Sequence, residues 1–257
     1  MYTREQWANL IHTEPHRIGH LIGFKDLTPL HSEWMKSMLF AREDQTLQGH
    51  RGSYKTTVLS LTEALLLVWQ PNNNILFFRK TDTDVGEVIT QTSKILQGPV
   101  FQIMVNDLYG CSLVLPTDTK SEITTNLTTS PRGVSQLIGL GIGTSITGKH
   151  ADIVITDDIV NVKDRISQAE REHTKLAYQE LQNIKNRGGR FINTGTPWHK
   201  EDAFSLMPNI KKYDCYHTGL ISPEELQRLR ESMSPSLFAA NYELRHIADA
   251  DALFSEP

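Results

Sequence analysis

Cysteine is scarce in this sequence. The 257 residues include two cysteines, Cys111 and Cys215, which lie far apart in the chain. So low a number excludes a disulfide framework, and the wide separation argues against a zinc site built from cysteines. Such a composition fits a reducing compartment such as the cytoplasm.

An excess of positive charge is also missing. The chain carries 26 lysines and arginines against 30 aspartates and glutamates, which gives a net charge of −4 and a pI near 6.2. A domain that binds nucleic acid with its whole surface is usually basic. Any contact with DNA or RNA must therefore be local, or must come from another domain or subunit.

Long apolar runs are absent as well. The best run spans residues 58–69, but Ser60, Thr62 and Glu63 interrupt it, and it is too short to cross a bilayer. The N-terminal segment lacks the uninterrupted apolar stretch of a signal peptide. We therefore expect a soluble protein that is neither secreted nor bound to a membrane.

The segment from Gly49 to Thr57 has the spacing of a phosphate-binding loop, or Walker A motif. In such a loop the backbone N–H groups surround the phosphates, Lys55 reaches the β- and γ-phosphates, and the Thr56 hydroxyl binds Mg²⁺. The apolar helix predicted after it would point its N-terminal dipole at the anion. The predicted nucleotide-binding residues of the loop are Gly49, His50, Arg51, Gly52, Ser53, Tyr54, Lys55, Thr56 and Thr57.

One residue of this loop departs from the pattern. Tyr54 stands where the last glycine before the lysine is expected. Glycine suits that position because it tolerates positive φ and lets the backbone approach phosphate, whereas a bulky residue at positive φ is an outlier. The loop alone therefore also fits a turn that caps a buried helix, and the rest of the chain must decide.

A second motif is the acidic end of an apolar strand. Residues 151–158 form a β-branched run that ends in Asp157 and Asp158. Open α/β sheets bind ligands at the carboxyl ends of their strands. In P-loop ATPases one such carboxylate helps to hold Mg²⁺ and its neighbour orients the attacking water. The alternative is a solvated acidic strand end, but an earlier phosphate loop favours the functional interpretation.

The remaining elements predict an α/β fold. The run Ile75–Arg79 is typical of a buried parallel strand, and a helix is expected over 83–96, so that strands and helices alternate as they do around a parallel sheet. Between residues 97 and 148 we expect an antiparallel or irregular region with short strands at 112–115, 122–126 and 136–140, and with a mobile loop over 139–148.

The second half of the chain predicts a long helix and two strands. We expect the helix over 165–187, ending in a basic cap with Lys185, Arg187 and Arg190, which are also candidates for phosphate or neighbouring-subunit contacts. A strand over 190–198 ends in Thr194-Gly195-Thr196, whose hydroxyls could sense a γ-phosphate and pass its loss to a moving element. Residues 213–218 predict another strand, and Ser222 and Ser234 each begin a helix.

The ordered motifs resemble the ATPase half of the large terminase subunit of tailed bacteriophages. The resemblance covers about residues 27–257. It is carried by the loop Gly49–Thr56, the strand 153–158 with its two aspartates, the segment 194–197, and the tail from Ser222 through Ser234 to Leu244. It implies a P-loop NTPase of the RecA-like or ASCE type, with a mostly parallel central sheet and helices on both faces.

The function implied by the resemblance is an ATP-hydrolysing motor that moves double-stranded viral DNA into a procapsid. Such a motor works as a homo-oligomeric ring on the portal protein, with a small terminase subunit that selects the DNA, and can be a monomer in isolation. It would lie in the host cytoplasm at the portal vertex, and its substrate would be ATP with Mg²⁺.

The resemblance also implies roles for single residues. Lys55 and Thr56 would hold phosphate and Mg²⁺, Asp157 would be the metal-binding Walker B carboxylate, and Asp158 would activate water. Arg51 would contact the γ-phosphate, and Thr194, Gly195 and Thr196 would couple hydrolysis to movement.

Three positions differ from the family pattern. Asp158 replaces the more usual glutamate, and His31 stands where an adenine-contacting glutamine is expected. Lys149 stands where an arginine that acts in trans is expected, and lysine lacks the bidentate fork of arginine.

We expect three parts in this chain: N-terminal helices and an adenine-side lead-in over 1–45, an ATPase core over 46–220, and a C-terminal helical part over 221–257. Because no plausible set of nuclease acids follows Trp198, we expect an ATPase domain alone, truncated near Phe254. Two alternatives are a helicase-like translocase and a nucleotide-binding assembly module with little hydrolysis. The basic pairs are candidate DNA contacts, although a solvated surface explains them more simply: Arg79, Lys80, Lys211 and Lys212.

Overall fold

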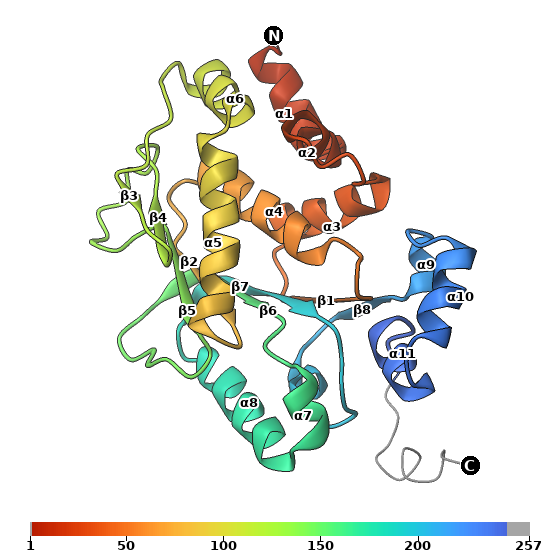
Figure 1. The fold of residues 1–257 in the computed structure, drawn as a ribbon. Coiled ribbons are helices and arrows are strands. Elements are labelled where there is room, and N and C mark those ends of the chain that lie inside the picture. The colour runs from red at the N-terminus through yellow and green to blue at the C-terminus, as the bar shows by residue number, and fades with distance from the viewer. Residues whose placement is uncertain (1, 246–257) are drawn as a thin grey trace, which may run out of the picture.

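The fold is built on one central sheet. The computed structural model describes residues 2–245, and its strands are β1 (Gln45–Gly49), β2 (Ile75–Arg79), β3 (Thr117–Asp118), β4 (Glu122–Thr124), β5 (Leu137–Gly141), β6 (Ala151–Asp157), β7 (Lys185–Gly195) and β8 (Ile210–Tyr213). Within these residues the eight strands form one sheet in the order β3-β4-β5-β2-β6-β7-β1-β8 (Figure 1). All neighbours in the run β5-β2-β6-β7-β1-β8 pair in parallel. At one edge of the sheet, β4 pairs antiparallel with β5, and β3 pairs antiparallel with β4.

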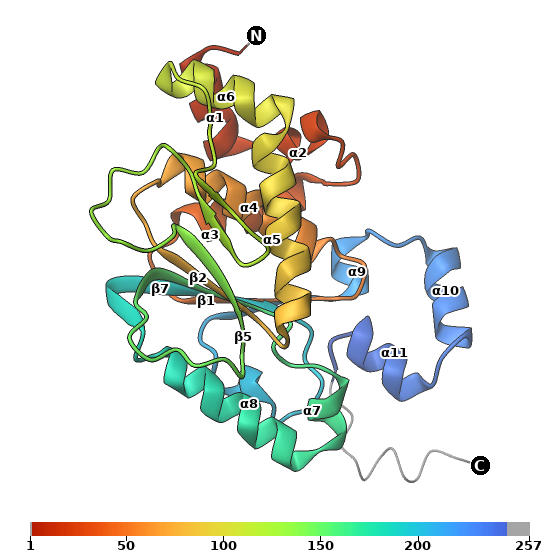
Figure 2. The same ribbon diagram turned by 60° about the vertical axis from the view of Figure 1, so that its left-hand side comes forward.

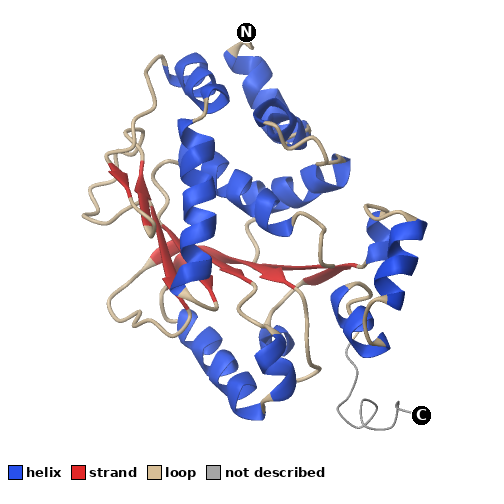
Figure 3. Ribbon diagram, viewed as in Figure 1, coloured by secondary structure: helices blue, strands red, loops and turns tan. Residues whose placement is uncertain are grey.

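Helices cover both faces of this sheet. They are α1 (Arg4–Thr13), α2 (His16–Ile22), α3 (Pro29–Phe40), α4 (Lys55–Trp69), α5 (Asp82–Gln97), α6 (Pro99–Tyr109), α7 (Val162–Ile166), α8 (Gln168–Leu181), the 3₁₀ turn η1 (Ala203–Leu206), α9 (Cys215–Thr218), α10 (Pro223–Glu231) and α11 (Pro235–Asn241). Helices α1 to α6 lie on one face and α7 and α8 on the other, while α9 to α11 pack beyond β8 (Figures 1 and 2). Figure 3 shows the sheet as a layer between the helices.

The hydrophobic core has two layers, one on each face of the sheet. Successive side chains of a strand point to opposite faces, so Phe77 of β2 packs with α1 to α6 whereas Phe78 packs with α8 and η1. Helix α4 is buried on nearly all sides from Val58 to Val68, as expected for a helix that is apolar all round. Burial of α4 fixes the position of the phosphate loop at its N-terminus.

Several sequence predictions are confirmed. Strand β2 has the predicted bounds, Ile75–Arg79, and the α/β class with a mostly parallel sheet is as expected. Ser222 and Ser234 cap α10 and α11, each by accepting a hydrogen bond from the backbone N–H three residues later, and each is followed by a proline at the first helical position.

The prediction of one long helix over 165–187 is wrong. Helix α7 ends at Ile166, Ser167 then caps α8 by accepting from the Glu170 N–H at 3.3 Å, and α8 ends at Leu181. The basic residues that suggested a helix cap belong instead to the first half of β7, where Arg190 pairs with Ile153 of β6. Gly188 and Gly189 are typical of a helix end, but here they belong to a strand because this segment pairs in parallel with β6.

Two further segments also differ from expectation. Residues 215–218 form α9 rather than the end of a strand, because Asp214 accepts hydrogen bonds from the N–H groups of Tyr216 and His217. The region 97–148 contains helix α6, which the surrounding Thr, Ser and Gly residues obscured, and the expected strand at 112–115 is replaced by the two-residue β3. Part of the predicted mobile loop belongs to β5.

The described part of the chain contains no helix with the length and apolar character that a membrane crossing needs. The predicted three-part division of the chain stays a prediction. The predicted domain end near Phe254 lies outside the described residues.

Candidate nucleotide site at the carboxyl edge of the sheet

Four neighbouring parallel strands end at the same edge of the sheet. They lie in the order β2-β6-β7-β1, and their ends with the residues that follow carry Arg79, the pair Asp157 and Asp158, the run 194–196, and the phosphate loop. The loop from Arg51 to Thr57 lines a hollow of about 370 Å³ together with Asp158 and Thr196. This edge is where open α/β sheets bind ligands.

The phosphate loop closes around the lysine. Lys55 is the first residue of α4 and is mostly buried, and its Nζ lies 3.2 Å from the His50 carbonyl oxygen and 3.4 Å from Thr196 Oγ1. A Cβ atom at Gly49 would lie 2.9 Å from Lys55 Cδ, so only glycine leaves room for this arrangement. The loop therefore holds the ammonium at the N-terminus of a buried helix, where an anion is favoured.

Tyr54 adopts the conformation expected of the missing glycine. Its backbone is left-handed, with φ 60° and ψ 19°, at a cost of roughly 1–2 kcal/mol for a residue with a side chain. The side chain is 39% exposed, and its hydroxyl donates to Asp26 Oδ2 at 3.1 Å. The departure from the motif therefore adds strain but keeps the path of the loop.

Asp157 is fully buried behind the loop. Its Oδ1 accepts from the Thr194 hydroxyl at 2.6 Å, and its Oδ2 faces the Thr56 hydroxyl at 3.4 Å and Arg79 Nε at 3.2 Å. Burial, and then the charge of Asp158, raise the pKa of Asp157 to about 6, although Arg79 and Thr194 oppose the shift. Asp157 is thus a buried carboxylate that contacts the threonine of the loop.

Asp158 turns outward at the end of β6. Its φ is 46°, and its backbone N–H donates to the Thr194 carbonyl at 3.1 Å. The carboxylate is 37% exposed and lies 3.5 Å from Arg79 Nη2. Because Asp158 lines the hollow whereas Asp157 lies behind it, the two neighbouring carboxylates have different surroundings.

The segment from Thr194 to Thr196 contacts both motifs. Thr194 donates to Asp157, and Thr196 donates to the Gly49 carbonyl oxygen at 3.0 Å. A Cβ at Gly195 would lie 2.9 Å from the Phe204 ring and 3.1 Å from Asp158 Oδ1, so the strand end must be glycine. The segment is a direct link between the acidic pair and the phosphate loop.

The residues present suit a hard cation. Mg²⁺ in phosphate-transfer sites usually takes one or two carboxylates, while phosphates and water supply the other ligands. The Thr56 hydroxyl and Asp157 Oδ2 are oxygen donors 3.4 Å apart. Among the described residues, no three His, Cys, Asp or Glu side chains are grouped as a metal site, so an ion here would need phosphate and water ligands.

His31 packs against the phosphate loop. Its ring is fully buried, Nδ1 accepts from the Thr28 N–H at 2.8 Å, and Nε2 lies 3.2 Å from the Ser53 carbonyl oxygen. Burial lowers the pKa of His31, which favours the neutral ring that this pattern needs. Neither ring nitrogen is left for an adenine, so the geometry does not support the expected base contact.

Two further loop residues connect the site to the C-terminal helices. His50 is buried, and its Nε2 lies 2.7 Å from the hydroxyl of Thr218 in α9. The Arg51 N–H donates to the Asn241 carbonyl of α11 at 2.8 Å, and the exposed Arg51 side chain lines the hollow. The loop is therefore braced by α9 and α11 as well as by the sheet.

Lys149 lies away from these residues. It precedes β6, so it is at the amino edge of the sheet, in a second hollow with Asn74, Arg132 and Asn186. Asp157, at the other end of the same strand, belongs to the candidate site. The structure therefore separates Lys149 from the candidate site of its own chain.

Arg79 and Lys80 were expected on a solvated surface, and this expectation is wrong. The side chains are 14% and 11% exposed. Arg79 pairs with both aspartates, while Lys80 Nζ lies 3.0 Å from Asp164 Oδ2 and donates to the Thr174 hydroxyl at 2.7 Å. The position of Arg79 at the end of a predicted buried strand was the signal that could have placed it in the site. Lys211 and Lys212, in contrast, are exposed on β8 as expected.

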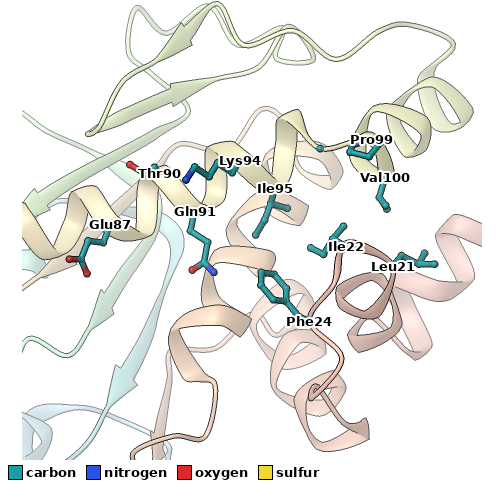
Figure 4. A pocket seen from close by; sticks show the side chains of 11 residues that line it. Leu21, Ile22, Phe24, Glu87, Thr90, Gln91, Lys94, Ile95, Pro99 and Val100 are labelled. Carbon is teal, nitrogen blue, oxygen red and sulfur yellow. The ribbon is translucent and has the colours of Figure 1, made fainter.

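A hollow of about 570 Å³ lies elsewhere, between α2 and the helices α5 and α6 (Figure 4). Its walls are mostly apolar, with Ile22, Phe24 and Ile95 among them, and its charged lining residues are Glu87 and Lys94. None of the predicted nucleotide-binding residues faces it. The candidate site is therefore identified by the residues that line it, and not by the size of the hollow.

No protein-family model matches the sequence, and no curated protein matches it. Solved structures do match. The ATPase domain of the large terminase from Thermus phage P74-26, in a variant form, has a TM-score of 0.54 and 12% identity, over 80% of this chain and 90% of that one. The HK97 bacteriophage large terminase has a TM-score of 0.55 and 11% identity, over 85% of this chain and 50% of that one.

A third match is the large terminase of a thermophilic bacteriophage in complex with ATP-γ-S, with a TM-score of 0.57 and 11% identity, over 84% of this chain and 51% of that one. This chain thus spans about half the length of the longer terminase chains. The matches confirm the predicted fold, because the chain has the architecture of terminase ATPase domains. At these identities the likeness concerns the fold alone.

Proposed function

We propose that this chain is the ATP-hydrolysing motor domain of a terminase large subunit. The observation that carries the proposal is the convergence of Lys55, Thr56 and Asp158 on one hollow at the carboxyl edge of the sheet, with the buried Asp157 directly behind Thr56. The terminase fold supports it, since one protein of this fold was solved both in complex with ATP-γ-S and in complex with ADP.

In this proposal the loop N–H groups and Lys55 bind the β- and γ-phosphates. Thr56 and Asp157 hold Mg²⁺, which neutralises phosphate charge when it is bound. Asp158 accepts a proton from the attacking water, whose oxygen bonds to the γ-phosphorus while the bond to the β-phosphate oxygen breaks. The products are ADP and inorganic phosphate.

The link between chemistry and movement is assigned to Thr194, Gly195 and Thr196. Thr196 contacts the loop and Thr194 contacts Asp157, so a change at either motif alters hydrogen bonds of this segment. Loss of phosphate would thus reach β7 and, through the loop, helices α9 and α11. Such release of a segment after hydrolysis is a known switching device.

The likeness to terminases also supports a proposal for how this chain assembles with its partners. The motor would form a homo-oligomeric ring on the portal of a procapsid in the host cytoplasm, with double-stranded DNA and a small terminase subunit as partners. Lys149 supports a contact between subunits, because it cannot reach the site of its own chain yet stands exposed enough to line a surface hollow. Arg51 remains a candidate for the γ-phosphate.

Steady-state phosphate release from Mg·ATP tests the proposal. Lys55→Ala should reduce turnover by about 10²- to 10³-fold or more, as loss of a preorganised charge usually does, and should weaken ATP binding. Lys211→Ala removes a lysine from the exposed face of β8 and serves as the matched control, with turnover unchanged. Equal turnover in wild type and Lys55→Ala would contradict the proposal.

A nucleotide-binding module with little hydrolysis is the second candidate. The observation that favours it is the contact between Arg79 and Asp158, because the guanidinium occupies a carboxylate oxygen that would otherwise be open to the attacking water. ATP binding without measurable turnover in the assembled complex would support this candidate. Turnover that disappears in Asp158→Asn would exclude it.

A further inference from the structure

The buried carboxylate Asp157 has one oxygen available for a cation. Its Oδ1 is engaged by the Thr194 hydroxyl at 2.6 Å. Its Oδ2 faces the Thr56 hydroxyl at 3.4 Å and Arg79 Nε at 3.2 Å. A metal ion between Thr56 and Asp157 and the Arg79 guanidinium therefore share the same oxygen atom.

Two cations at one oxygen repel each other. The guanidinium keeps its charge at every relevant pH, and its repulsion of a divalent ion is strong beside a fully buried carboxylate. Arg79 has a second contact, to Asp158 Oδ2 at 3.5 Å. Its Nε is close to Asp157 but is buried with no hydrogen-bond partner, so the present contact is electrostatic and poorly aligned.

An acceptor without a partner lies near this arginine. Glu63 belongs to α4, about two turns after Thr56, and its side chain is fully buried. Thr92 donates to its Oε2 at 2.8 Å, whereas its Oε1 has no hydrogen-bond partner. Burial raises the pKa of Glu63 to about 8, while the charge of Arg79 acts in the opposite direction. Arg79 Nε and Glu63 Oε1 are thus two buried polar atoms without hydrogen-bond partners, and Glu63 is close enough to Arg79 and Asp157 to be affected by both charges.

We propose that Arg79 is a positioning residue that holds the acidic pair until Mg²⁺ arrives with the nucleotide, and that the metal then displaces it from Asp157 to Glu63. The inference rests on the proposed ATPase function. It assigns Arg79 a role that opposes metal binding and Glu63 a role that assists it. The same exchange satisfies both buried atoms that lack partners.

Binding of a fluorescent, non-hydrolysable ATP analogue is measured as a function of Mg²⁺ concentration at pH 8. Arg79→Gln is expected to lower the half-saturating Mg²⁺ concentration by about tenfold, because a competing charge is removed. Glu63→Gln is expected to raise that concentration by roughly threefold or more, because the displaced arginine loses an acceptor that can ionise beside it. In the double variant Glu63→Gln has no further effect, since its partner is absent.

Two variants serve as controls. Lys80→Gln removes the neighbouring cation, which is similarly buried but pairs with Asp164, and leaves the Mg²⁺ requirement unchanged. Arg79→Lys keeps a cation in place and retains a requirement close to that of wild type. Circular dichroism establishes that each variant is folded, and if Arg79→Gln is unfolded, the rise in Glu63→Gln decides the question.

An unchanged or higher Mg²⁺ requirement in folded Arg79→Gln, or an unchanged requirement in Glu63→Gln, overturns the inference while leaving the ATPase proposal in place. A wild-type protein that binds no analogue at any Mg²⁺ concentration contradicts the proposed function, and the inference with it.

Discussion

The two edges of the central sheet differ in chemistry although the same strands form both. At the carboxyl edge, hydroxyls and carboxylates contact one another and the phosphate loop, as Thr194 and Thr196 do. At the amino edge, Lys185 pairs with Asp44 at 2.7 Å and Arg132 pairs with Asp152 at 3.0 Å. Charges thus stabilise the structure at the amino edge, whereas at the carboxyl edge they are arranged around a hollow.

This difference follows from how a parallel sheet is connected. Strands β1, β2 and β6 each leave the carboxyl edge through a segment that leads into a helix, so helix N-termini and strand-end side chains gather there. Strands enter at the amino edge from helix C-termini. Substitutions at the carboxyl edge should therefore change chemistry, and those at the amino edge should leave the chemistry of an isolated chain intact.

The largest effect is expected for Asp158→Asn. Loss of a general base typically reduces turnover by about 10²- to 10⁴-fold. ATP binding should remain close to wild type, because Lys55 and the loop are unchanged. Phosphate release and equilibrium binding of a nucleotide analogue measure the two properties separately. Normal turnover in this variant would remove Asp158 from the mechanism and weaken the contrast between the edges.

A smaller effect concerns the pH dependence of stability. The pKa of Glu63 is raised to about 8 in the folded chain, well above its value in an unfolded chain. The contribution of Glu63 to stability is therefore complete below the unfolded pKa and is lost as pH rises from about 4.5 to about 8, by on the order of a few kcal/mol. Glu63→Gln should flatten this decline, as chemical denaturation at several pH values would reveal.

Glu172→Gln provides the control for that measurement. This glutamate is exposed on α8, so its substitution should leave the decline with pH unchanged. A decline with pH that is equal in wild type and Glu63→Gln would show that Glu63 is not held in its protonated form.

Thr196→Ala should have a moderate effect. The hydroxyl donates to the Gly49 carbonyl and lies 3.4 Å from Lys55 Nζ, so its loss leaves buried polar groups unpaired at a cost of about 1–3 kcal/mol. We expect a stability loss of this size and about tenfold slower turnover, with Thr196→Ser largely restoring both. Failure of the serine variant to restore turnover would show that the hydroxyl is not the relevant group.

The smallest effect is expected at the amino edge. Lys149→Ala should leave turnover of the dilute, isolated chain unchanged, because Lys149 and the candidate site lie at opposite edges of the sheet. A dependence of turnover on protein concentration in wild type that is lost in Lys149→Ala would identify a contact between subunits. Slower turnover of the variant at high dilution would contradict the separation of the two edges.

The parts of the site that sequence reasoning predicted are those encoded by local spacing. The lysine and threonine of the loop, the acidic strand end and β2 all follow from short runs of residues, and the fold class follows from their alternation. Tyr54 has the left-handed backbone conformation expected of a glycine at this position, so the loop keeps its path although the residue differs from the motif.

The parts that were missed depend on contacts between distant segments. Arg79 belongs to the site because β2 lies beside β6, and His31 is buried because α3 packs beneath the loop. The basic run at the start of β7 looked like a helix end until its pairing with β6 was known. No local pattern specifies which strands become neighbours.

The most direct test of the central claim is a crystal structure of this chain with Mg²⁺ and ATP-γ-S. We expect the terminal phosphates to lie within hydrogen-bonding distance of Lys55 Nζ, and the ion to lie beside the Thr56 hydroxyl and Asp157. Nucleotide bound with its phosphates away from Lys55, for example in the hollow between α2 and α5, would contradict it.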